Sequence, residues 1–308
     1  VSGTGFQPDF TWTKSRSNTL NHNIYDAIRG ATKMLKPNLT HAEGTDAQSL
    51  KTFDSDGFTV GTDTHINTNG ATFVSFNWKA NGSGSANTTG TINTISTSAN
   101  VDAGFSIVKW VGNEGSDESI GHGLSKAPEM ILTWNLDEGW GNATYHKDMG
   151  TDKYLMMSET TGHENMSDTD IWANTAPTSS VFYVGTDIMT NWDDRNYIAY
   201  CFHSVDGYSK FGSFKGNNNA DGTFVYLGFR PMWILVKRIY PNGFNWMLFR
   251  HDDKQLEANS TSVEFGGDYI DMLSNGFKAR TQTNTVNDSA DYIYMAFAET
   301  PFKYSNAR

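Results

Sequence analysis

The sequence contains little cysteine and no long apolar segment. Cys201 is the single cysteine among 308 residues, which excludes a disulfide bond within the chain. It stands between Tyr200 and Phe202 in an apolar run, so we interpret it as a small core residue rather than a nucleophile. No stretch approaches the run of about 18 apolar residues that is typical of a membrane-spanning helix. The N-terminal region also lacks the charged-then-apolar pattern of a secretion leader, and we therefore expect neither membrane insertion nor a leader.

Positive charge is also scarce. The chain has 23 Lys and Arg residues against 34 Asp and Glu residues, which gives a net charge of -11. No basic stripe is present that would displace counterions from phosphates. This balance argues against nucleic acid as a partner and is compatible with a neutral ligand.

Metal-binding spacings are missing as well. The eight histidines are isolated, and neither His-Glu-x-x-His nor Cys-x-x-Cys occurs. We interpret His122, between two glycines, as a turn residue, with a ligand-facing role as the alternative. Acidic clusters such as Asp168 with Asp170 offer oxygen ligands for Ca²⁺, but the twelve-residue loop with its closing Glu is absent. Solvated loop carboxylates are the favoured interpretation, the metal question stays open, and we expect no cofactor.

What the chain has in abundance is aromatic and turn-forming residues. Aromatics make up 13% of the sequence, with nine Trp and thirteen Tyr, and 29 glycines accompany many Ser, Thr and Asn residues. Aromatic and β-branched side chains suit a pleated surface, while Gly, Asn and Asp supply turn geometry. The composition therefore predicts many short strands joined by turns.

Three segments of the chain repeat one another. Pro8, Pro128 and Pro231 head similar strands and lie 120 and 103 residues apart, so the repeat has the size of one domain. Each copy also contains a phenylalanine followed fifteen residues later by an aromatic residue that opens a strand. These closing strands are Phe73–Trp78, Tyr197–Phe202 and Tyr292–Phe297. Their alternating residues are apolar, which predicts a strand with one buried face, while the opposite face would lie against a loop or a neighbouring copy.

The first copy is shorter than the others at its start. The second and third copies begin with the matching segments Gly104–Asn113 and Gly207–Asn217, whereas the first has only Gly5–Pro8 of this region. We expect its opening strands to be missing, or to come from residues before Val1 or from another chain.

These landmarks divide the chain. We predict a first β repeat at 1–80, a linker or edge strand rich in Gly, Ser, Thr and Asn at 81–103, a second repeat at 104–205 and a third at 206–308. Strands spaced over about one hundred residues favour an all-β fold of tandem antiparallel β-sandwich repeats, of jelly-roll or lectin-like type. A closed barrel is the alternative.

The repeated motifs resemble an uncharacterised repeat domain family of virion proteins in marine and cyanobacterial tailed phages. The resemblance covers essentially the whole chain, and its motifs are Gly5–Ser17, Ile28–Leu35, Ser55–Gly61, Tyr197–Phe202, Gly207–Phe214, Leu273–Lys278 and Tyr292–Arg308. It implies a virion surface protein of tail-fibre type, assembled in the host cytoplasm, concerned with host attachment and forming a homotrimer with other virion proteins as neighbours. It supplies no catalytic residues.

Tryptophans in polar loops are the best candidates for binding. A flat ring among Asn and Asp residues can stack on the apolar face of a sugar while its neighbours take the hydroxyls. The alternative is that each Trp closes the end of its own sandwich. The candidate ligand-binding residues are Trp192, Asp193, Asp194, Trp140, Asn142 and Trp172, with Trp192 the first to test.

Three functions are compatible with these features. We expect a non-enzymatic attachment protein that binds bacterial surface glycan. The alternatives are a structural or decoration protein whose repeats tile against neighbouring subunits, and a glycan-degrading enzyme. The last needs two carboxylates facing each other across a groove, which a sequence alone cannot show.

Overall fold

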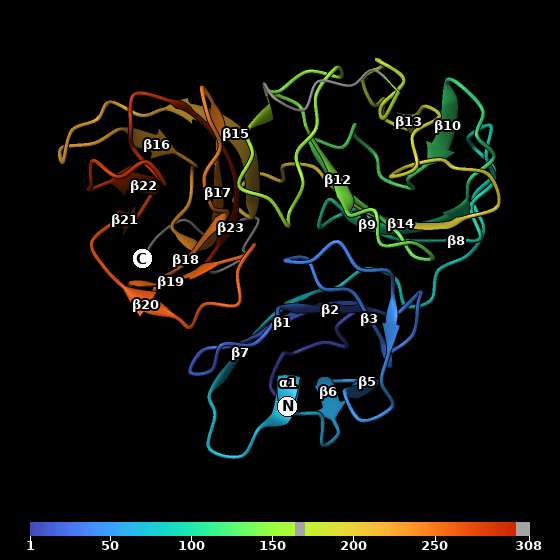
Figure 1. Ribbon diagram of the computed structural model, residues 1–308, viewed down its shortest axis with the longest axis horizontal. Helices are drawn as coiled ribbons and strands as arrows, with labels where there is room; N and C mark the ends of the chain where they lie inside the picture. The colour runs from blue at the N-terminus through green and yellow to red at the C-terminus, as the bar shows by residue number, and fades with distance from the viewer. Residues whose placement is uncertain (164–169, 300–308) are drawn as a thin grey trace.

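The computed structural model describes residues 1–163 and 170–299. In these residues the chain is nearly all β, and its one α-helix is the short α1 (Thr64–Asn67), capped by the side chain of Asp63. Figure 1 shows the three repeats as three lobes around a common centre, the first in blue, the second in green and yellow, the third in orange and red. The predicted all-β fold built from antiparallel repeats is confirmed.

Each repeat contains one main sheet with the same three central strands. The first sheet has the order β2-β1-β7, the second β12-β11-β14-β9-β8 and the third β15-β23-β17-β18-β19-β20. Their bounds are β1 (Phe10–Ser15), β2 (Asn23–Asp26), β7 (Phe73–Trp78), β8 (Ser96–Asn100), β9 (Phe105–Val111), β11 (Met130–Asn135), β12 (Asn142–His146), β14 (Asn196–Phe202), β15 (Ser209–Lys215), β17 (Pro231–Tyr240), β18 (Met247–Arg250), β19 (Lys254–Glu257), β20 (Phe265–Gly266) and β23 (Asp291–Ala298).

Pairing registers confirm that the repeats are equivalent. Trp12 lies opposite Phe76, as Leu132 lies opposite Tyr200 and Leu235 opposite Met295. The three predicted closing strands are β7, β14 and β23, and the predicted opening segments form β9 and β15.

Small sheets lie on the outer side of the main sheets. They are β3 (Lys33–Met34) with β4 (Gly44–Thr45), β5 (Leu50–Asp54) with β6 (Gly57–Val60), β10 (Glu118–Gly121) with β13 (Val181–Val184), and β16 (Phe224–Tyr226), β22 (Gly276–Ala279) and β21 (Ile270–Leu273). Each repeat buries its own apolar cluster between the main sheet and these strands, with Phe58, Phe182 or Phe277 contributed by the outer layer. Each repeat is therefore a two-layer sandwich.

The other faces of the three main sheets share one core. This central core takes residues from every repeat, among them Phe10, Trp12, Phe105, Leu132, Tyr200 and Leu235. Rings from different repeats meet edge to face: Phe10 is 4.6 Å from Tyr200, and Trp78 is 5.7 Å from Trp233, between ring centroids. The more apolar face of each closing strand thus packs on neighbouring repeats, and the less apolar face, with Ala199 and Cys201, packs on its own outer sheet. The repeats share a core because a sheet that is apolar on both faces needs a partner on each.

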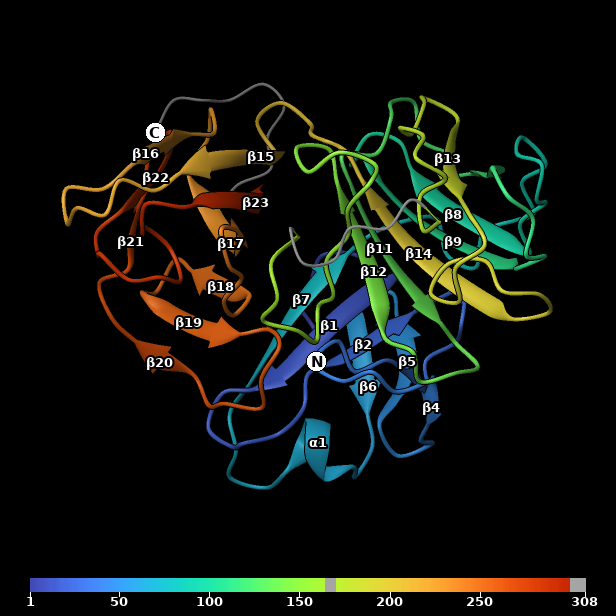
Figure 2. The ribbon, with the colours of Figure 1, turned by 45° about the horizontal axis from the view of Figure 1, so that its top comes forward.

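Hydrogen bonds join the third repeat to the first and to the second at the edge of this core. Burial lowers the pKa of His22 to about 3, so its ring is neutral. Its Nδ1 accepts from Trp12 Nε1 (3.0 Å), and its Nε2 donates to the carbonyl of Glu257 in the third repeat (3.1 Å). In the equivalent position of the third repeat, Trp246 Nε1 donates to the carbonyl of Met156 in the second (2.9 Å). Figure 2 shows the three main sheets turned toward one another.

The spacer 81–103 and the start of the first repeat differ in the strands that they contribute to the sheets. The spacer 81–103 contributes an edge strand, β8, which pairs with β9 of the second repeat. The first repeat has no strand equivalent to β9 or β15, so β7 pairs only with β1 among the described residues. In the part of the chain that the structure describes, no helix is long and apolar enough to cross a membrane.

Candidate functional site

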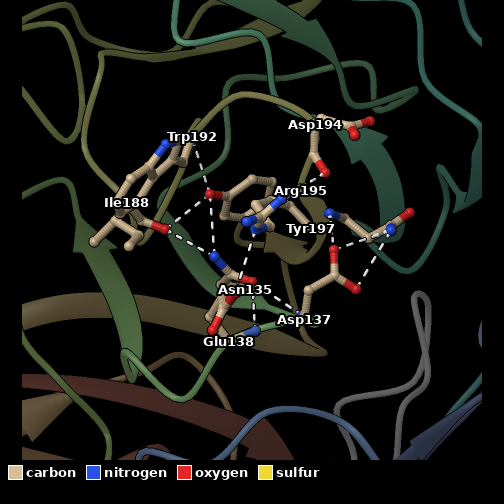
Figure 3. Close-up of polar contacts among 9 residues, drawn as sticks. Asn135, Asp137, Glu138, Ile188, Trp192, Asp194, Arg195 and Tyr197 are labelled. Atoms are coloured by element: carbon tan, nitrogen blue, oxygen red, sulfur yellow. Dashed lines mark hydrogen bonds and ion pairs between the residues drawn. The ribbon is translucent and has the colours of Figure 1, made fainter.

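Trp192 is an exposed tryptophan that borders a pocket in the second repeat. Its side chain is 42% exposed. Its backbone N–H donates to the hydroxyl of Tyr197 (2.8 Å), which in turn donates to the carbonyl of Ile188 (2.8 Å) and accepts from Asn135 Nδ2 (3.2 Å). Burial raises the pKa of Tyr197, which keeps this hydroxyl protonated. Figure 3 shows the network that fixes the loop under the indole.

A polar pocket opens next to this ring. It has a volume of about 320 Å³ and is lined by Glu114, Asp170, Thr186, Asp187, Ile188 and Trp192. Three of these six residues carry carboxylates, which accept hydrogen bonds from hydroxyl donors. One flat apolar surface and several acceptors therefore border the same space.

The loop that carries Trp192 is tied to the loop that leads to Trp140. Arg195 Nε lies 3.4 Å from Glu138 Oε1, and the backbone N–H of Asn196 donates to Asp137 Oδ2 (2.7 Å). Trp140 itself is 55% exposed. Asp193 and Asp194 are exposed at the tip of the Trp192 loop, where Asp194 adopts a left-handed backbone with φ 53°. Four of the six predicted binding residues are thus at the surface of two loops that are joined by these contacts.

The other two predicted binding residues, Trp172 and Asn142, are buried and do not reach the surface of these loops. Trp172 is 2% exposed and packs edge to face on Tyr145, with ring centroids 5.8 Å apart. It closes the apolar core of the second repeat, as the alternative interpretation held. Asn142 is fully buried, and its Oδ1 accepts from the N–H of Met157 (2.6 Å). Its amide is used for joining β12 to the following turn.

Other residues with reactive side chains lie in structural positions. Cys201 is fully buried, and burial raises the pKa of its thiol, which agrees with a core residue. His122 is also buried; its Nδ1 accepts from the N–H of Leu124 (3.1 Å), and burial lowers its pKa to about 4. Within residues 1–163 and 170–299 no three His, Cys, Asp or Glu side chains form a group that could hold a metal ion. Asp168 lies outside the described residues.

Comparison with protein families gives a match along almost the whole chain. The family model described as a domain of unknown function (DUF7483) matches residues 1–301. The chain belongs to the DUF7483 family. Comparison with curated proteins and with solved structures gives no match. The resemblance to phage virion proteins therefore stays a prediction from sequence motifs.

A larger pocket than the one beside Trp192 lies outside the predicted sites of this DUF7483 chain. It has a volume of about 780 Å³ and lies along β7, between the first and third repeats. Its lining includes Phe76, Trp78, Trp233 and Phe297, which belong to the aromatic pattern of the closing and Pro-headed strands. The signal that pointed to it was the shortened start of the first repeat.

Proposed function

We propose that this protein is a phage virion surface protein of tail-fibre type that attaches to bacterial surface glycan without cleaving it. The observation that carries the proposal is the indole of Trp192, held by the Tyr197 network at the edge of the acidic pocket. The sequence motifs of the repeats supply the virion context. In this proposal the protein works as a homotrimer among other virion proteins, at the virion surface.

The chemistry of the pocket favours a sugar over other ligands. Pyranose rings have an apolar face that stacks on an indole, and their hydroxyls donate to carboxylates such as Glu114 and Asp187. Because the chain has a net charge of -11, a neutral or amino sugar is preferred over an acidic one. The anchored loop lowers the entropic cost of binding, since Trp192 is held in place before the ligand arrives.

A glycan array with matched variants tests the proposal. Trp192→Ala should weaken binding of purified protein to arrayed bacterial glycans and to host cells by about tenfold or more, because it removes the stacking surface. Phe224→Ala is the control, since Phe224 is 44% exposed, close to the 42% of Trp192, and lies on the third repeat. Both variants should retain the wild-type far-UV circular dichroism spectrum. Undiminished glycan binding by Trp192→Ala would remove this ring from the site.

One observation favours the second candidate, a structural or decoration protein. One edge of β7 pairs with no strand in the described part of the chain, and a neighbouring subunit can add a strand there. Sedimentation of the purified 34.2 kDa chain separates the two functions. A well-behaved monomer or trimer with glycan affinity supports attachment, whereas assembly into larger arrays without glycan affinity supports the structural role. Release of reducing ends from host polysaccharide would instead indicate an enzyme.

A further inference from the structure

The groove along β7 is bordered by an edge of that strand with which no strand of residues 1–163 and 170–299 pairs. It is lined by the consecutive residues 74–79, and by Tyr208, Trp233, Arg250 and Phe297 from the third repeat. We call it the β7 groove. Of the six residues of β7 only Trp78 is buried, whereas the equivalent strands β14 and β23 are buried along nearly their whole length.

The backbone of β7 presents hydrogen-bonding groups to this groove. The carbonyl of Trp78 accepts from the N–H of Asp9, beside β1 (2.9 Å). Because backbone groups alternate in direction along a strand, those of Phe76 and Val74 also face β1. The N–H and C=O groups of Ser75 and Asn77 therefore face the β7 groove.

The second and third repeats show what covers this edge. In the second repeat β9 runs antiparallel along β14, and in the third β15 runs antiparallel along β23. Each covering strand adds apolar side chains to the central core: Phe105 and Ile107 from β9, and Phe211 from β15. Phe105 stacks on Phe202 with ring centroids 4.8 Å apart and meets Phe10 edge to face at 5.9 Å.

The groove repeats this environment in the first repeat. By register, Trp78 takes the place of Phe202, and Trp233 takes the place of Phe10. Both of these tryptophans line the β7 groove. An aromatic side chain that entered the groove in the manner of Phe105 would meet the same pair of rings.

We propose that the β7 groove binds an extended segment of a second polypeptide, which adds to the main sheet as a strand antiparallel to β7. The backbone N–H and C=O groups of Ser75 and Asn77 form the hydrogen bonds to the added strand. The register of β9 and β15 fixes the side chains: an apolar residue opposite Phe76, where Ile107 and Phe211 lie, and an aromatic or small residue opposite Trp78, where Phe105 and Ser209 lie. The proposal rests on sheet geometry alone and does not depend on glycan binding.

Charge at the rim of the groove is mixed. Lys79, Arg250 and His251 lie on the lining together with Asp102, Asp206 and Asp252. Lysine and arginine side chains therefore stand beside carboxylates on the lining, so no strong preference for one sign of charge is expected. Specificity therefore comes from the alternation of side chains and from the backbone ladder.

The protein itself supplies the probe for a test. A labelled synthetic peptide with the sequence of residues 104–112, Gly-Phe-Ser-Ile-Val-Lys-Trp-Val-Gly, should bind the purified 308-residue chain in fluorescence anisotropy. The same peptide with Pro at the Val108 position should bind about tenfold more weakly, because Val108 pairs with Ala199, the equivalent of Ser75, and proline removes that donor. Failure of the unmodified peptide to bind, or equal binding of both peptides, would overturn the proposal.

Two further measurements locate the peptide. Hydrogen exchange on the wild-type chain should show new protection at Ser75 and Asn77 when the peptide is present, and this readout needs no variant. Ser75→Pro should abolish binding while preserving the fold, since its N–H faces the groove and proline is tolerated on such an edge. Protection elsewhere in the chain would contradict the proposal. If the chain alone forms a dimer that Ser75→Pro dissociates, the added strand comes from a second copy of this chain, and addition of a strand from a different protein is overturned.

Discussion

The closing strands β7 and β14 carry similar patterns in very different surroundings. Both alternate apolar residues toward the central core, with Val74, Phe76 and Trp78 matching Ile198, Tyr200 and Phe202. β14 lies between β11 and β9 and is almost wholly buried. Among the strands that the structure describes, β7 pairs with β1 alone, and it is mostly half-buried. Alternation therefore predicts which face of a strand is apolar, whereas the neighbouring strands determine how much of that face is buried from water.

The largest difference is expected when equivalent aliphatic residues are shortened. Ile198 is fully buried and Val74 is half-buried in the same register position. Ile198→Ala should lower the free energy of unfolding by about 2–5 kcal/mol, because it leaves a cavity in the central core. Val74→Ala should cost about 1 kcal/mol, since less apolar area is lost. Urea unfolding at equilibrium measures both, and equal losses would contradict the contrast between the strands.

A smaller effect is expected at the polar position that only β14 has. The hydroxyl of Tyr200 donates to Asp26 Oδ2 (2.7 Å), and Arg29 forms a buried ion pair with the same carboxylate. Phe76 carries no hydroxyl at the equivalent position. Tyr200→Phe should lower the free energy of unfolding by about 1–3 kcal/mol, because a buried carboxylate loses a donor.

Tyr292→Phe is the matched control for this substitution. The hydroxyl of Tyr292 donates to a neutral acceptor, the carbonyl of Asn284 (3.1 Å). Its removal should cost about 1 kcal/mol. A loss as large as that of Tyr200→Phe would show that the charge of Asp26 does not matter.

The smallest effect is expected in the pH dependence of the free energy of unfolding, at the residues that pair with Val74 and Ile198. Lys14 lies opposite Val74, and the uncharged Trp134 lies opposite Ile198. Burial lowers the pKa of Lys14 from 10.5 to about 8. Between these two values the unfolded chain binds the proton and the folded chain does not, so folded stability rises with pH across this window. Below about pH 8 the cost of the buried charge is fully present.

Lys14→Met isolates this contribution. Compared with the variant, the wild-type chain should gain on the order of 1–2 kcal/mol of unfolding free energy between about pH 7.5 and pH 10. Other titrating groups, such as Cys201 and the tyrosines, cancel because both proteins contain them. Parallel pH dependence in the two proteins, measured by urea unfolding, would show that the Lys14 ammonium is well solvated in the folded state.

Much of the fold could be predicted because it depends on local periodicity. The fifteen-residue offset placed β7, β14 and β23, and the Pro-headed segments placed β1, β11 and β17. The shortened start of the first repeat predicted that this repeat lacks an opening strand. The shared central core could not be predicted, since both faces of a strand such as β14 are apolar enough to be interior.

The candidate site shows the same limit at single residues. Trp172 and Trp192 both stand among polar neighbours, yet one closes a core and the other is 42% exposed. Tyr197, which holds the Trp192 loop, was recognised only as a strand residue. The hydrogen bond from its hydroxyl to the carbonyl of Ile188 joins β14 to the preceding loop, and the alternation of residues in the strand does not encode it.

By itself, the sequence determined the all-β class, the repeats and the strands, because composition, turn residues and a period of two act over a few residues. Tertiary structure decided what each apolar face meets. Three sheets of similar pattern close around one core, which buries β14 and β23 and, within the described residues, leaves one edge of β7 unpaired. That outcome depends on long-range packing, in which a strand is buried only when another segment of polypeptide lies beside it.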